Sequence, residues 1–67
     1  MIVVQVNGKA REIEAGLTVA GFLESIGQEP RLVAIELNGD ILKRRLFEET
    51  ELKEGEKVEV VRFVQGG

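Results

Sequence analysis

The two glycines at the end of the chain make its terminal carboxylate the group best suited to take part in a reaction. Gly66 and Gly67 follow an apolar run that reaches Phe63 and Val64, with Gln65 between them. Two residues without Cβ atoms form a narrow, flexible segment that fits a narrow active site. The two glycines therefore predict that the carboxylate of Gly67 reacts, and that Gly66 and Gln65 form the tail that presents it. A frayed terminus is the plainer interpretation, because chain ends are usually mobile.

The side chains offer little chemistry of their own. The 67 residues include no cysteine and no histidine. This excludes thiolate chemistry and disulfides, and it removes the side chain whose ordinary pKa suits proton transfer near neutrality. The sequence has neither a glycine-rich phosphate loop with a lysine nor a helix with paired metal ligands. We therefore expect no catalytic residue, no metal site and no bound cofactor, and we expect a partner to supply the catalytic groups.

Composition narrows the class of partner. A net charge of −3 argues against nucleic acid, whose phosphates require clustered lysine and arginine. Three Phe without Trp or Tyr make a poor platform for stacking bases. The length and the 43% hydrophobic and 31% charged residues fit one globular domain over 1–67. No apolar run approaches the ~20 residues of a membrane span, and the start lacks a basic leader, so we expect a cytoplasmic protein.

Two Asn-Gly pairs predict two β-hairpins. A type I′ turn needs a positive φ at both central residues, and Asn-Gly is the pair that adopts it most readily. Asn7-Gly8 and Asn38-Gly39 each stand between apolar stretches with the alternation of strands. The strands predicted around the two turns span residues 1–6, 9–14, 33–37 and 41–42.

A short amphipathic helix is predicted after the first hairpin. Thr18 has the hydroxyl of an N-cap, and Gly27 suits the position after the helix. Gly21 weakens the helix by about 1 kcal/mol relative to Ala, so either packing holds the helix in place or Gly21 allows close approach to the sheet. Four apolar residues share one face of this helix: Val19, Phe22, Leu23 and Ile26.

The second half of the chain supplies the candidate contact residues. We expect a loop with a helical turn over 46–54, pinned by Leu52, and a last strand over 57–64. Lys43, Arg44 and Arg45 form a basic cluster, which is either a solvated face or a docking patch for an acidic partner surface.

The last strand has two apolar faces. Val58 and Val60 point one way, and Val61 and Phe63 point the other. If the first pair faces the helix, Val61 and Phe63 lie on the open face, with Val3 nearby on the first strand. Exposed apolar patches often mark contact surfaces, although scattered surface hydrophobes are also common.

Strands grouped around one helix predict an α+β domain with the helix on one face of the sheet. If residues 1–6 and 57–64 lie side by side in parallel, the long connection between them is the crossover that parallel strands require. The expected fold is thus a β-grasp with a mixed sheet of four or five strands and a C-terminal tail at about 65–67.

The chain resembles the ubiquitin-like superfamily and, within it, the ThiS family of bacterial sulfur carriers of thiamine biosynthesis. The resemblance covers nearly the whole chain. Its parts, in order, are residues 7–8, 16–19, 33–38, 52–61 and 63–67. Arg44 matches an arginine that this family often has after its fourth strand, whereas Lys43 stands where a proline is common.

The resemblance implies a protein co-substrate rather than an enzyme. An adenylating enzyme of the ThiF type would use ATP and Mg²⁺ to activate the Gly67 carboxylate. A partner's persulfide would then leave a thiocarboxylate, whose sulfur passes to a thiazole synthase of the ThiG type. In this account ATP and Mg²⁺ bind the partner.

Three other functions remain open at this stage. Sulfur carriers of molybdopterin synthesis or of another thiolation pathway share the chemistry and differ in the acceptor. A ubiquitin-like interaction module would leave the Gly-Gly ending without a role. Conjugation to lysines of other proteins would use the same activated carboxylate.

Overall fold

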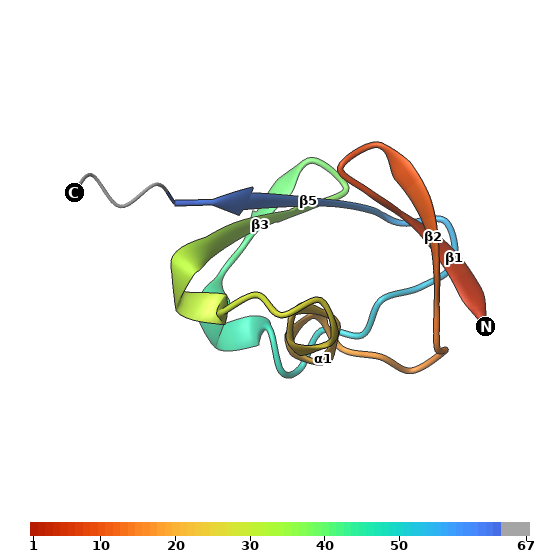
Figure 1. Ribbon diagram of the computed structural model, residues 1–67, viewed down its shortest axis with the longest axis horizontal. Coiled ribbons are helices and arrows are strands. Elements are labelled where there is room, and N and C mark those ends of the chain that lie inside the picture. The colour runs from red at the N-terminus through yellow and green to blue at the C-terminus, as the bar shows by residue number, and fades with distance from the viewer. Residues whose placement is uncertain (64–67) are drawn as a thin grey trace.

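The structure is a computed structural model that describes residues 1–63. Over that range, the chain forms a five-stranded sheet with one α-helix lying across one of its faces (Figure 1). The strands are β1 (Ile2–Val6), β2 (Lys9–Ile13), β3 (Val33–Leu37), β4 (Asp40–Leu42) and β5 (Lys57–Arg62). The helix is α1 (Val19–Ser25), and two 3₁₀ turns are η1 (Pro30–Leu32) and η2 (Arg44–Leu46).

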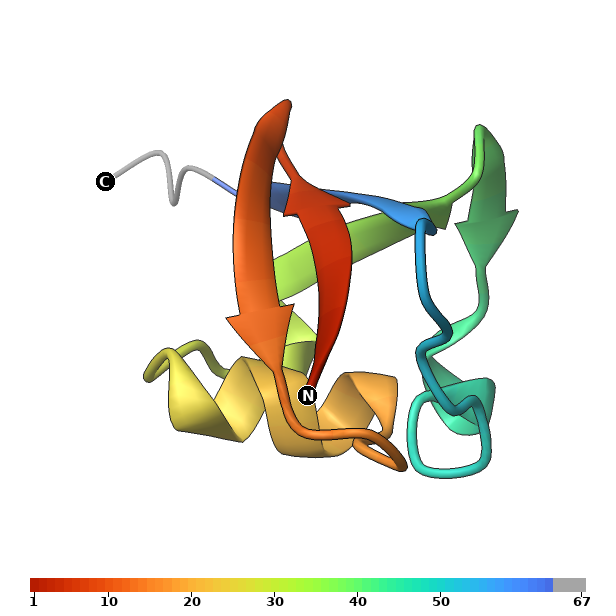
Figure 2. The same cartoon turned by 90° about the vertical axis from the view of Figure 1, so that its right-hand side faces the viewer.

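The sheet has the strand order β2-β1-β5-β3-β4. β1 and β5 are parallel neighbours at its centre, and the other pairs are antiparallel. The two views agree that α1 covers only one side of this sheet (Figures 1 and 2). The predicted pairing of the opening and closing strands is confirmed, and with it the mixed-sheet β-grasp.

Both predicted hairpin turns are confirmed. Asn7 and Asn38 have φ values of 51° and 53°, and the glycines that follow them have φ values of 84° and 90°. Positive φ at both central residues is the type I′ geometry, whose twist matches that of the strands on either side. The register leaves only the Asn-Gly pair in each loop, so the turns fix which side chains face α1.

Helix α1 begins at the predicted cap. The Gly21 N–H donates to Thr18 Oγ1 at 3.0 Å. Two further N–H groups of the first turn, those of Val19 and Ala20, donate to carbonyls of the loop after η2, at 2.8 and 2.9 Å. Of the two interpretations of Gly21, close approach to the sheet was wrong: a Cβ there would meet Leu17 Cδ1 at 2.9 Å. The close neighbour is thus a side chain before the helix, not the sheet.

The core lies between α1 and the covered face of the sheet. The long loop also contributes to it, because Phe47 is buried together with the predicted anchor Leu52. The buried residues are Val4, Ile13, Val19, Phe22, Leu23, Val33, Ile35, Phe47, Leu52 and Val58. Of the helices in residues 1–63, none is long and apolar enough to cross a membrane.

Candidate functional site

Strand β5 leads directly to the residues with the predicted chemistry. It runs between β1 and β3, and its C-terminal end reaches the side of the molecule opposite Met1 (Figure 1). Phe63 follows the strand, and its N–H donates to the Leu32 carbonyl at 2.9 Å. The predicted reactive residue Gly67 and its tail, Gly66 and Gln65, lie outside the described residues.

The first hairpin turn holds β5 along one edge. The Asn7 backbone N–H donates to the Val58 carbonyl at 2.9 Å. Its side chain then bonds both backbone groups of Val60: Oδ1 accepts from the Val60 N–H at 2.7 Å, and Nδ2 donates to the Val60 carbonyl at 3.2 Å. The Asn7 amide thereby continues the β1 ladder beyond the end of that strand.

The second hairpin turn holds β5 along its other edge. The Asn38 N–H donates to the Lys57 carbonyl at 2.7 Å, and Asn38 Oδ1 accepts from the Lys57 N–H at 2.9 Å. Asn38 Nδ2 also donates to the Glu56 carboxylate at 3.3 Å. The two turns therefore hold β5 from both sides, with Asn38 at its first residue, Lys57, and Asn7 at Val58 and Val60. The Asn-Gly pairs predicted the turns, but nothing in the sequence indicated that both amides would bind β5.

The face of the sheet away from α1 carries exposed apolar side chains near the end of β5. Val61 on this face is 51% exposed. Phe63, which follows the strand, is 45% exposed, and its place on the open face stays a prediction. Ile41 on β4 is 69% exposed, and it was missed as a contact candidate because it was assigned only to a short strand. The alternation that separates Val58 and Val60 from Val61 therefore agrees with the prediction.

Val3 faces the same side as Val61 but lies far from it. Val6 pairs with Val58 across the parallel strands, which places Val3 beside residue 55. Val61 lies six positions further along the chain than residue 55. At ~3.3 Å per residue, this places Val61 roughly 20 Å from Val3. The prediction that Val3 lies near Val61 and Phe63 was wrong, because the register offsets the two strands.

Arg44 has local partners. Its Nε donates to the Pro30 carbonyl at 3.2 Å, and its Nη2 donates to the Arg31 carbonyl at 3.3 Å. These bonds join η2 to η1, immediately before β3. They give Arg44 a structural role in shaping the loops, whereas its role in docking a partner stays a prediction.

The mixed sheet with β1 and β5 parallel at its centre and one helix on one face is the β-grasp fold of the ubiquitin-like class. Within this class, the model of the ThiS family matches residues 4–67. The chain belongs to the ThiS family, as its sequence motifs predicted.

A solved relative has the same fold. The crystal structure of the thiamine biosynthesis protein ThiS from Geobacter metallireducens superposes with a TM-score of 0.84 at 33% identity. The match covers 98% of this chain and 100% of that one.

Two curated relatives are much longer proteins. The chain is 34% identical over 62 residues to a thiazole synthase of Paramagnetospirillum magneticum, covering 92% of this chain and 19% of that protein. It is 36% identical over 64 residues to a thiazole synthase of Magnetococcus marinus, covering 96% and 20%. The chain thus spans about a fifth of the length of these two enzymes.

Proposed function

We propose that this chain is a sulfur carrier for the thiazole branch of thiamine biosynthesis. It acts as a cytoplasmic protein co-substrate, and its partners perform the catalysis. The observation that carries the proposal is the family match, which runs through the β-grasp and includes Gly66 and Gly67. Within residues 1–63, no three His, Cys, Asp or Glu side chains gather in the manner of a metal site.

The chemistry takes place at the Gly67 carboxylate. A carboxylate resists nucleophilic attack because it is negatively charged and its oxygen leaves poorly. An adenylating enzyme, which binds ATP and Mg²⁺, joins this carboxylate to AMP and releases pyrophosphate. The terminal sulfur of a partner's persulfide then attacks the carbonyl carbon and displaces AMP. A thiol cleaves the resulting S–S bond, which leaves a thiocarboxylate on Gly67.

Thiazole synthase is the proposed acceptor of this sulfur. In two relatives, the matching segment is part of a polypeptide named as a thiazole synthase. A carrier joined to an enzyme in one chain is a natural arrangement for two proteins that work in succession. The exposed side chains of Val61 and Phe63, next to the tail, are the proposed apolar contacts with partner enzymes.

The first test is the intact mass of the chain after incubation with ATP, the adenylating enzyme and a persulfide donor from the same organism. We expect a gain that matches the replacement of one oxygen by one sulfur, and subsequent loss of that sulfur to thiazole synthase. An unchanged mass would refute the carrier function. Rescue of a thiazole-requiring strain, with no rescue of a molybdopterin-deficient one, would separate the thiamine pathway from its alternative.

The second test is Gly67→Ala, which adds one methyl group at the reacting residue. An activating site must align the carboxylate with the α-phosphate, and about 1 Å of misplacement can cost ~10²-fold in rate. We expect ATP–pyrophosphate exchange to fall by about this factor while thermal unfolding is unchanged. Glu48→Gln, on the exposed loop after η2, is the control and should exchange at the wild-type rate. Exchange by Gly67→Ala at the wild-type rate would contradict the proposal.

A further inference from the structure

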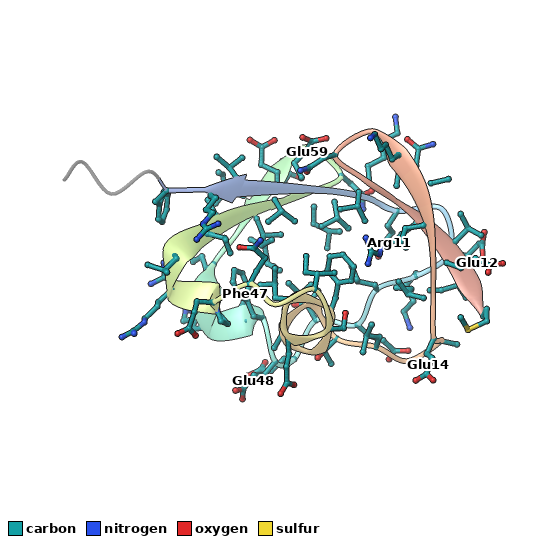
Figure 3. All side chains as sticks on the ribbon, viewed as in Figure 1. Arg11, Glu12, Glu14, Phe47, Glu48 and Glu59 are labelled. Atoms are coloured by element: carbon teal, nitrogen blue, oxygen red, sulfur yellow. The ribbon has the colours of Figure 1, made fainter. Side chains whose placement is uncertain are left out.

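Two glutamates stand directly opposite each other on the open face of the sheet. Glu36 on β3 pairs with Glu59 on β5 in the antiparallel register. Their neighbours along the strands, such as Ile35 and Val58, are buried against α1, so both carboxylates point to the other side. Figure 3 shows Glu59 on the side of β5 away from α1. Directly opposed residues in such a pair have Cα atoms about 5.5 Å apart or less.

Within residues 1–63, no ion pair relieves the repulsion between these two groups. Like charges directly opposite each other destabilise a sheet. Neither the Glu36 nor the Glu59 carboxylate forms an ion pair or a hydrogen bond with another group of residues 1–63. Other glutamates are used locally: Glu54 accepts from the Val3 N–H at 3.0 Å, and Glu56 accepts from the Lys53 N–H at 2.7 Å.

The acidic pair has exposed apolar neighbours on both sides, and Lys57 lies on the same face, two residues before Glu59 on β5. Ile41 stands opposite Glu36 on β4, and Val61 lies two residues beyond Glu59 on β5. Any protein that covered Ile41 and Val61 would also remove water from the two carboxylates. Burying an unpaired charge costs several kcal/mol, so a partner that fits this surface must bring a positive charge to the pair.

From this arrangement we propose that Glu36 and Glu59 together bind an arginine or lysine side chain on thiazole synthase, set among apolar residues that contact Ile41 and Val61. The proposal rests on the proposed function, because it names the partner from the two relatives in which the domain and the enzyme share a chain. A guanidinium fits especially well, since its planar fork can donate to two carboxylates at once. A second copy of this chain fits poorly, because a two-fold contact through this face would bring four carboxylates together.

The test is calorimetric titration of the full-length chain with the thiazole synthase of the same organism. For the Glu36→Gln, Glu59→Gln double variant, we expect the Kd to rise about tenfold or more, since charge-assisted hydrogen bonds are lost. Its Kd should also depend less on salt than that of the wild type. The Glu48→Gln, Glu49→Gln double variant removes the same number of charges from two neighbouring exposed residues, of which Glu48 lies on the opposite side of the molecule (Figure 3), and its Kd should be unchanged.

Sulfur loading separates failure of this proposal from failure of the carrier function. The Glu36→Gln, Glu59→Gln double variant should still gain its thiocarboxylate in full, as measured by intact mass at the end of the reaction, because the tail that reacts is unchanged, and its unfolding should show that the fold is kept. A double variant that loads normally and binds thiazole synthase as tightly as the wild type would overturn the acidic-pair site and leave the carrier function standing. Weakened binding to the adenylating enzyme alone would also overturn it. A wild-type chain that never gains sulfur would refute both.

Discussion

The two faces of the sheet are built from alternate residues of the same strands, yet one face is buried and the other is exposed. On β5, Val58 is fully buried against α1, whereas Val61 is 51% exposed on the other side. The covered face packs against the helix and the long loop, and its side chains determine whether the chain folds. On the open face, Ile41 and Val61 remain exposed, and Phe63 after the strand is also exposed; we propose that these three side chains contact a partner.

The contrast has a simple physical origin. A small domain has one core, and burial of apolar surface in that core is its main source of stability. A single helix can cover only one face of the sheet. The other face of this sheet therefore stays exposed, and it carries both apolar and charged side chains, such as Val61, Glu59 and Lys57.

The largest expected difference between the faces concerns two phenylalanines. Phe22 is fully buried in α1, and Phe63 is 45% exposed after β5. Phe22→Ala should lower the free energy of unfolding by about 3–5 kcal/mol, because it removes a large buried side chain and leaves a cavity. Phe63→Ala should lower it by less than about 1 kcal/mol. Urea unfolding of both variants is the measurement, and equal losses would mean that the open face is part of the core.

The next largest change in the free energy of unfolding is expected when the bonds between Asn7 and β5 are removed. Asn7→Ala removes two side-chain bonds to Val60 and puts a Cβ-bearing residue without a local polar group at a φ of 51°. We expect a loss of about 2–3 kcal/mol in the free energy of unfolding, combining lost hydrogen bonds with left-handed strain.

Asn7→Gly is the matched control for this variant. Glycine accepts a positive φ without a penalty, so only the side-chain bonds are lost and the expected cost is about 1 kcal/mol. If both variants are equally stable, the strain contributes nothing. If neither differs from the wild type, the Asn7 bonds to β5 do not stabilise the fold.

Short sequence patterns predicted the turns, the helix and the strands well, because residues close together in the sequence determine each of these elements. The Asn-Gly pairs predicted both turns, Thr18 predicted the start of α1, and strand alternation separated Val58 from Val61. The motifs shared with the ThiS family predicted membership of that family, which the match of the family model over residues 4–67 confirmed.

Relations between distant segments were harder to predict. The distance between Val3 and Val61 depends on the register of two parallel strands joined by some fifty residues of chain, and no local signal encodes it. The burial of Phe47, the bonds of Arg44 to η1 and the opposition of Glu36 and Glu59 arise in the same way. Each depends on which segments the completed sheet brings together.

The smallest expected change in the free energy of unfolding is a gain, whereas the variants above are expected to lower it. Glu59→Gln removes one of the two opposed charges on the open face, where Glu36 is its partner across the strands. The free energy of unfolding should therefore rise by about 0.2–1 kcal/mol, the range for cross-strand pairs. The measurement is urea unfolding at low ionic strength, where charge repulsion is least screened.

The control for this variant is again Glu48→Gln, which changes the net charge equally on an exposed loop. It should alter the free energy of unfolding by less than about 0.5 kcal/mol. A gain confined to Glu59→Gln, lost as salt is added, would show that the wild-type sheet retains a repulsion that lowers its stability. Equal gains in both variants would instead point to the net charge of the whole chain, and the open face would then have no special acidic pair.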